Sequence, residues 1–181
     1  MGCGRKHVSV MANIYLISDS HFGHANILKF LGADGKRIRP EFSSVEEMDE
    51  YMVDKWNSVV TPQDHVWHLG DVVMSRHNLP IIHRLYGHKR LILGNHDRED
   101  MSAYRNAGFQ KIVGSRIYDG VLMTHFPVHP GSMGKAVGNA HGHIHQHPSP
   151  PGPYINMSVE RWDYTPQPIE IVKAAILAKK D

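Results

Sequence analysis

The segment LILGNHD (91–97) joins an apolar run directly to three polar side chains. The run Leu-Ile-Leu has the composition of a buried β-strand, and the glycine after it marks the strand's end. A strand that only needed to turn would be followed by Asn-Gly or Asp-Gly. Here an amide, an imidazole and a carboxylate follow instead, at Asn95, His96 and Asp97. The segment therefore predicts a strand whose carboxyl end carries chemistry, with Asp97 as a structural turn or helix-cap residue.

Other short apolar runs in the chain have the same character and predict further strands. Together with 90–94, they cover residues 13–18, 65–69, 120–125, 139–145 and 154–159. The pair Asp119-Gly120 is typical of a two-residue hairpin, so we expect an antiparallel strand pair around it.

Helical patterns lie between these runs. In 43–60, apolar residues recur every three or four positions, and either Ser43 with Glu46 or Ser44 with Glu47 forms a capping box. The segments 78–87 and 98–108 each end in glycine and predict short helices, and 169–180 predicts a weaker one. Alternation of strands and helices predicts an α/β fold, in which ligands bind beyond the carboxyl ends of strands.

Composition indicates a globular protein with one domain over residues 1–181, of which 1–10 are expected to form a loose extension. The chain is 41% hydrophobic and 21% charged, and no apolar run is long enough to cross a bilayer. Cys3 is the only cysteine, which is typical of a reducing compartment. The start resembles neither a signal peptide nor, with Lys6 in the Ser/Thr position, an acylation motif. We expect a cytoplasmic protein without a membrane partner.

Metal-capable side chains recur where the predicted strands end. If the carboxyl ends lie together, one edge of one sheet could gather them all. The set comprises Asp19, His21, Asp71, Asn95, His96, His125, His143 and His145.

The residue types in this set suit borderline divalent metals. Imidazole, carboxylate and amide oxygen together favour Mn, Fe, Co, Ni or Zn, and the absence of cysteine ligands argues against a thiolate zinc site. Without His96 the set still holds seven ligand-grade residues, which is too many for one ion. Two ions that share a bridging carboxylate would use them, and such pairs act on phosphate esters by clamping the attacking and leaving oxygens. Hydrolysis of phosphate esters is therefore the predicted reaction.

The ordered series DSH, GD, GNHD, H and GHIH, from Asp19 to His145, resembles the calcineurin-like metallophosphoesterase superfamily. The resemblance implies a four-layer α/β/β/α sandwich with two central mixed β-sheets. It also implies two divalent metal ions and a hydroxide that bridges them as the nucleophile. The implied roles are Asp19, His21 and His145 on the first ion, Asn95, His125 and His143 on the second, Asp71 as the bridge and His96 as the catalytic histidine.

The remaining histidines and arginines have weaker signals. His24 and Arg98 lie near enough in sequence to the set to reach a substrate phosphate and are the candidate substrate-binding residues. The alternatives are a helix-capping or surface role for His24 and a solvated position for Arg98. If 139–145 is extended, His143 and His145 share a face; His141 and His147 continue this parity and are left out of the site. Half-buried or surface positions are expected for His65, His68, His83 and His88.

The leading hypothesis is a phosphoesterase that acts on diesters rather than monoesters, including nucleotide-derived ones, because a small chain leaves the cleft open. A nuclease of the same superfamily is the alternative. The net charge of +2 and the lack of a basic stripe with interleaved aromatics disfavour a nucleic-acid partner. A non-catalytic scaffold or a metal-storage module would have no need of His96, so the sequence disfavours both.

Overall fold

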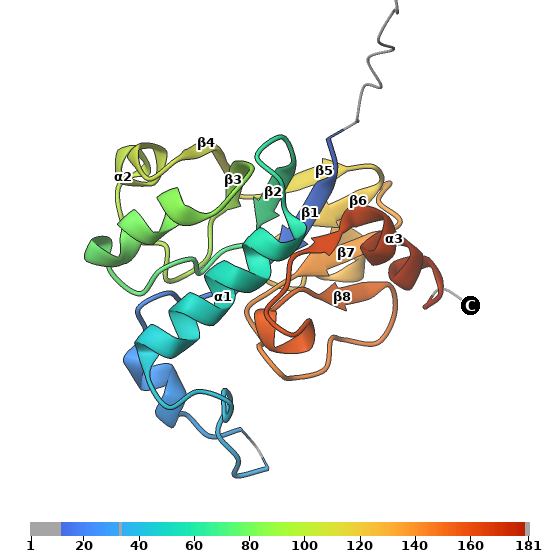
Figure 1. Ribbon diagram of the computed structural model, residues 1–181. Helices are drawn as coiled ribbons and strands as arrows, with labels where there is room; N and C mark the ends of the chain where they lie inside the picture. The colour runs from blue at the N-terminus through green and yellow to red at the C-terminus, as the bar shows by residue number, and fades with distance from the viewer. Residues whose placement is uncertain (1–11, 33, 180–181) are drawn as a thin grey trace, which may run out of the picture.

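A five-stranded sheet is the larger of the two sheets in the computed structural model, which describes residues 12–32 and 34–179 (Figure 1). The expected extension at 1–10 lies outside the described residues. The strand order is β4-β3-β2-β1-β9, with β9 antiparallel to β1 and the other neighbours parallel. The strands are β1 (Ile14–Ile17), β2 (His65–His68), β3 (His88–Ile92), β4 (Phe109–Val113) and β9 (Gln167–Pro168).

A four-stranded sheet of order β5-β6-β7-β8 follows. Its strands are β5 (Arg116–Tyr118), β6 (Val121–Met123), β7 (Gly138–His141) and β8 (Tyr154–Asn156). β5 and β6 pair in antiparallel fashion around Asp119-Gly120, which confirms the predicted hairpin, whereas β6, β7 and β8 are parallel. The predicted strand 139–145 is wrong beyond β7, because the chain leaves the sheet after His141.

The described part of the chain has three α-helices and four 3₁₀ helices, and all but the last helix, α3, lie between strands. The predicted helix in 43–60 is confirmed as α1, and Ser44 caps it by accepting a hydrogen bond from the Glu47 amide. Residues 78–84 of the predicted helix 78–87 instead belong to 3₁₀ helix η2, since Pro80 lacks an amide hydrogen and obstructs regular α-helical bonding there. The elements are η1 (Ala25–Lys29), α1 (Val45–Val59), η2 (Arg76–Arg84), α2 (Met101–Asn106), η3 (Pro130–Ser132), η4 (Val159–Arg161) and α3 (Ile169–Leu177).

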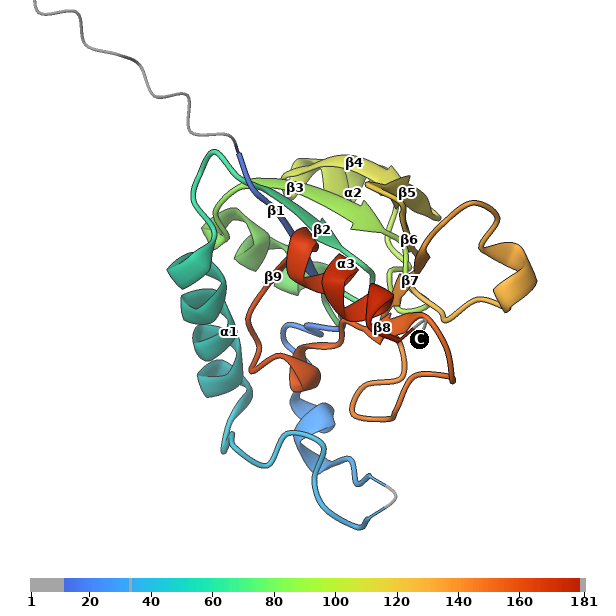
Figure 2. The same ribbon diagram turned by 90° about the vertical axis from the view of Figure 1, so that its right-hand side faces the viewer.

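The first strand shows how the layers pack. Tyr15 and Ile17 belong to a core shared with α1, η2 and α2, whereas Ile14 and Leu16 belong to a core shared with the four-stranded sheet and α3. Alternate residues of a strand point to opposite faces, so both faces of β1 are buried. Figure 2 shows α1 and α3 on different sides of the strands. The predicted α/β architecture with two mixed sheets flanked by helices is confirmed.

The carboxyl ends of β1, β2 and β3 lie at one end of the first sheet, and the chain beyond β6 and β7 meets them there. The expectation that one edge of one sheet gathers the candidate residues is therefore wrong. Both sheets contribute, because they pack face to face and their parallel strands end at a common place.

Candidate metal centre

Five of the eight candidate residues have left-handed backbone. Left-handed φ angles are uncommon for residues other than glycine and cluster where a site fixes side-chain directions. Each of these residues directs its side chain from a sharp turn, not from a regular strand, so the parity argument for His143 and His145 was wrong. The φ values are 59° at Asp19, 49° at His21, 57° at Asp71, 72° at His143 and 48° at His145.

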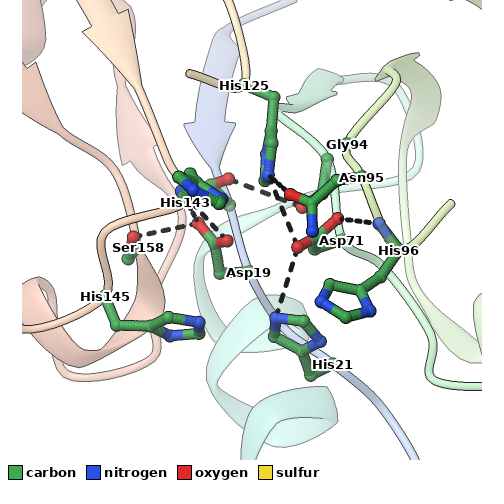
Figure 3. A network of polar contacts seen from close by, with 12 residues as sticks. Asp19, His21, Asp71, Gly94, Asn95, His96, His125, His143, His145 and Ser158 are labelled. Atoms are coloured by element: carbon green, nitrogen blue, oxygen red, sulfur yellow. Dashed lines mark hydrogen bonds and ion pairs between the residues drawn. The ribbon is translucent and has the colours of Figure 1, made fainter. Parts of the chain in front are cut away.

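Two groups of metal-capable side chains lie side by side in Figure 3. Within each group, one ligand atom from every residue lies within 4.8 Å of the others. Each group could hold a metal ion. Group one consists of Asp19, His21 and His145, and group two of Asp71, His125 and His143.

Asp71 lies between the two groups. Its Oδ2 is 3.6 Å from Nε2 of His21 in group one and 3.4 Å from Nε2 of His125 in group two. Asn95 adds a neutral oxygen to group two, with Oδ1 at 3.0 Å from the same nitrogen of His125. Ligand bonds of about 2.0–2.2 Å place neighbouring ligand atoms roughly 3 Å apart around one ion. The separations around Asp71 are therefore those expected between ligand atoms of a metal ion.

His125 is oriented by the protein backbone. Its Nδ1 lies 2.8 Å from the carbonyl oxygen of Leu69, so in the neutral ring Nδ1–H donates and Nε2 presents a lone pair to Asp71 and Asn95. Although burial opposes it, the Asp71 carboxylate raises the pKa of His125, while His125 and His21 hold the pKa of Asp71 well below its usual range. A field that favours a proton at this position also favours a metal cation.

His145 is oriented by a buried charge pair. Its Nδ1 lies 3.0 Å from Oε1 of Glu160, and the Arg39 guanidinium donates to that same oxygen at 2.9 Å. Although burial alone would raise it, Arg39 and His145 lower the pKa of Glu160 to about 2. A carboxylate behind a metal-binding histidine fixes the ring and increases its basicity. Nε2 of His145 is thus left for group one.

Sequence reasoning missed Glu160 and Arg39. The Arg39 side chain is fully buried and donates to the carbonyl oxygens of Ser20 and Asp19, which holds the turn after β1. Neither residue stands at a strand end or in a motif with the site residues. Their 121-residue separation leaves no local signal that could have paired them.

Asp19 is buried, and hydrogen bonds fix its carboxylate. Its carboxylate accepts hydrogen bonds from the His143 amide, at 2.9 Å, and from the Ser158 hydroxyl, at 2.9 Å. Burial raises the pKa of Asp19 because the ionised form loses hydration. A cation at group one would restore the favourable electrostatics of that ionised form.

His21 gives the most direct sign that group one fits a cation. The side chain is 3% exposed, yet neither ring nitrogen has a hydrogen-bond partner within the described part of the chain. Buried polar atoms are nearly always paired, so an unpaired imidazole needs an explanation. Burial lowers the pKa of His21 well below its ordinary value, and a neutral imidazole is the form that binds metal.

Gly94 and Asp97 bring the ends of β2 and β3 together. A Cβ on Gly94 would lie 2.2 Å from Oδ1 of Asp71, so glycine is required there by close approach. The Asp97 carboxylate accepts the backbone N–H groups of Asp71, Val72 and Gly94. Asp97 is structural, as predicted, but it links two loops and does not cap α2, whose N-cap is Asp100.

The predicted catalytic and substrate residues border these groups. His96 donates its backbone N–H to Oδ1 of Asp71 at 2.8 Å, and its ring centroid is 5.4 Å from that of His21. The ring centroid of His24 lies 5.6 Å from that of His21. Arg98 is exposed and donates from Nε to the carbonyl oxygen of Asn95.

The histidines left out of the site lie apart from both groups. His65 and His88 are half-buried neighbours and His83 is exposed, as expected. His68 is the exception, because it is buried and its Nε2 lies 2.8 Å from the Ser20 hydroxyl. His141 is also buried, but its ring bonds to Gly142 and Ser149, and neither it nor His147 belongs to a ligand group.

Comparison with known proteins places the chain beside an archaeal relative. Uncharacterized protein MJ1445 of Methanocaldococcus jannaschii is 32% identical over 175 residues, and the match covers 90% of each chain. The chain belongs to the family of this protein. No family model matches the sequence. The Gene 66 proteins of mycobacterium phages L5 and D29 are 39% and 35% identical, over 48% and 54% of this chain and 41% and 46% of their own lengths.

Two solved structures share the fold. A protein of unknown function, AQ665 from Aquifex aeolicus, has a TM-score of 0.68 at 24% identity, over 91% of this chain and 99% of its own. The nuclease MPE of Pseudomonas putida has a TM-score of 0.50 at 18% identity, over 73% and 61% respectively. Among the described residues, no helix has the length and apolarity needed to cross a membrane.

Proposed function

We propose that the protein is a metal-dependent phosphoesterase of the calcineurin-like superfamily that hydrolyses phosphodiesters. The observation that carries the proposal is the position of Asp71, whose Oδ2 lies within 3.6 Å of a histidine from each ligand group. Two ligand groups joined by one carboxylate fit a pair of divalent ions. The fold likeness to a nuclease supports phosphate-ester chemistry at the same coarse level.

The residues of the site have two kinds of role, as metal ligands and as a proton donor. Asp19, His21 and His145 would hold one ion, and Asn95, His125 and His143 the other, with Asp71 between them. When bound, two such ions supply an activated water and offset the negative charge of the phosphate. His96 belongs to neither ligand group and borders group one, so its ring is free to contact the phosphate and to donate a proton to the leaving oxygen.

A nuclease is the second candidate function. The fold resembles that of the P. putida nuclease over 73% of this chain, and this likeness favours a nucleic-acid substrate. The net charge of +2 argues in the other direction. The chemistry at phosphorus is the same for both candidates, so the substrate decides between them.

The test is hydrolysis of bis-p-nitrophenyl phosphate and p-nitrophenyl phosphate by metal-stripped protein with Mn, Ni, Co, Zn or Mg added back. We expect metal-restored turnover that favours the diester. His96→Ala and Asp71→Asn should each lower it by more than about 100-fold, because one removes the proton donor and the other replaces the shared carboxylate with a neutral amide. A single-stranded oligonucleotide and a cyclic nucleotide, assayed in parallel, distinguish nuclease from small-diester activity.

His147→Ala is the matched control, since His147 is an exposed histidine two residues beyond His145 and outside both groups. Its turnover should match that of the parent protein. Tight metal binding without turnover on any ester would contradict the proposal and favour a storage module. Failure to bind metal at all would favour a non-catalytic scaffold.

A further inference from the structure

The phenylalanines of this chain fall into two classes. Of the five, Phe22, Phe42 and Phe109 are buried in the core. Phe30 and Phe126 are 48% and 46% exposed, and both lie next to histidines of the candidate metal centre. Exposed large apolar side chains are unremarkable when scattered, but a pair gathered at one site indicates a contact surface.

Phe126 borders group two. Its ring centroid is 4.4 Å from that of His143 and 4.9 Å from that of His125. The hydroxyl of Thr124 donates to the Phe126 carbonyl oxygen at 2.6 Å, which fixes the backbone at this turn. The ring is therefore held against two ligand histidines while nearly half of the residue faces solvent.

Phe30 is separated from group one by His24. Its ring packs edge-on against His24, with centroids 5.5 Å apart, and His24 in turn lies 5.6 Å from His21. The Phe30 amide donates to Ile27, and its carbonyl oxygen accepts from Ile38, so this backbone is also held. Phe126 thus lies against two histidines of group two, whereas His24 separates Phe30 from His21 of group one.

We propose that Phe126 and Phe30 are stacking platforms for the two nucleosides that flank the scissile phosphate of a single-stranded nucleic acid. This inference rests on the proposed function and names its substrate class. A phosphodiester carries two substituents, and the exposed rings, Phe126 against group two and Phe30 beyond His24 from group one, provide a surface for each. Every nucleobase has a π-face, so stacking on aromatic side chains binds single strands with little sequence preference.

A duplex does not fit these platforms, because its bases already stack on one another. An alkyl diester gains less from them, because it has no flat π-face to stack on a ring. The platforms come from loops far apart in sequence, so no local run of basic and aromatic residues announces them.

The closing experiment compares two diesters with the same leaving group, thymidine 5′-p-nitrophenyl phosphate and methyl p-nitrophenyl phosphate. The parent protein should prefer the thymidine ester. Phe126→Ala should lower the ratio of the two kcat/KM values by about 5- to 150-fold, the range of one base–aromatic stack. Phe126→Trp should retain the ratio, since it keeps a stacking face, and Phe126→Leu should lose it.

Tyr86→Ala is the control, since Tyr86 is 49% exposed but precedes β3 at the opposite end of the sheet. Its ratio should equal that of the parent protein. An unchanged ratio in Phe126→Ala, or an equal fall on both esters, would overturn the platform and leave Phe126 as packing for His143.

Binding of fluorescein-labelled decathymidylate, followed by anisotropy, tests Phe30 and does not depend on turnover. Phe30→Ala and Phe126→Ala should each weaken binding by at least about 5-fold, and a matched duplex should bind more weakly than the single strand. Equal binding of duplex and single strand, or no effect of either variant, would overturn the inference. If no diester is hydrolysed but these binding effects hold, the proposed function fails and the stacking surface stands.

Discussion

Group one and group two hold their histidines by different means. In group one, His145 is held by the buried carboxylate of Glu160, which is itself paired with Arg39. In group two, His125 is held by the backbone carbonyl of Leu69. One group therefore depends on a distant charge, and the other on the path of the chain at the end of β2. Substitutions of side chains can reach the first support directly, whereas only changes in backbone geometry reach the second.

The carboxylates of the two groups also differ, in the direction in which their pKa values are shifted. Burial raises the pKa of Asp19 in group one, whereas the neighbouring histidines hold the pKa of Asp71 well below its usual range. Group two thus has an ionised oxygen ready for a cation. In group one, burial disfavours the ionised form of Asp19, so metal binding there would depend more on the ring that Glu160 orients, and the two groups should respond to different substitutions.

The largest effect is expected from Gly94→Ala, which attacks the backbone support. Its Cβ would lie 2.2 Å from Oδ1 and 2.6 Å from N of Asp71, so the shared carboxylate must move. A displacement of about 1 Å at a reacting centre can cost about 100-fold in rate, and overpacking costs about 1–3 kcal/mol of stability. Diester hydrolysis, metal content by mass spectrometry and urea unfolding measure the three consequences.

Gly114→Ala is the matched control for this glycine, because a Cβ there meets nothing within 4 Å. Its activity and metal content should equal those of the parent protein. If Gly94→Ala kept full metal content and turnover, the close approach of the β2 and β3 ends would have no bearing on the site.

A smaller effect is expected from Glu160→Gln, which attacks the charged support. The isosteric amide can still accept from His145 but no longer balances Arg39, so the ring loses its charged partner. Changes behind a metal-binding histidine typically cost about 10- to 100-fold in metal affinity. Competition with a fluorescent chelator should show that the affinity for one of two ions falls by that factor and that the affinity for the other is unchanged.

Glu170→Gln, at an exposed position in α3, is the matched control and should leave both affinities as they are. Equal weakening of both ions by Glu160→Gln would show that the groups are not separately supported. The contrast drawn between them would then be wrong.

The same contrast explains how much the sequence could reveal. Apolar periodicity predicted the strands and α1, and polar residues after each strand named the side chains that the fold brings together. The order of motifs along the chain was sufficient, because parallel strands end at one place whatever the loops between them. A local pattern was enough for Asp71 and Asn95 for this reason.

What could not be predicted depends on contacts between distant segments. Arg39 and Glu160 meet only after both sheets have packed, and an isolated arginine or glutamate is usually solvated. His143 and His145 looked like alternating strand residues, but the left-handed turns after β7 direct them instead. His68 was expected to be half-buried or on the surface. It is buried because its strand, β2, pairs with β1 on one side and β3 on the other, and this pairing has no local sequence signal.

The smallest effect concerns His68, which supports the turns behind both groups. Its Nδ1 accepts from the Gly70 amide, so the neutral ring carries its proton on Nε2 and donates it to the Ser20 hydroxyl. That hydroxyl donates to the carbonyl oxygen of Val72, which joins the chain after β1 to the chain after β2. Burial lowers the pKa of His68 from 6.5 to about 3.

Because the folded pKa is the lower one, the unfolded chain binds a proton at His68 as pH falls through 6.5, and the folded chain does not. Stability from the neutral ring is therefore present above pH 6.5 and declines below it, by about 1.4 kcal/mol at pH 5.5. His68→Gln should be less stable than the parent protein at pH 7.5, and this deficit should shrink by that amount at pH 5.5. Urea unfolding at the two pH values measures it, with His83→Gln as the exposed control. A deficit that stayed constant with pH would mean that His68 is protonated in the folded protein, which its bond from Gly70 does not permit.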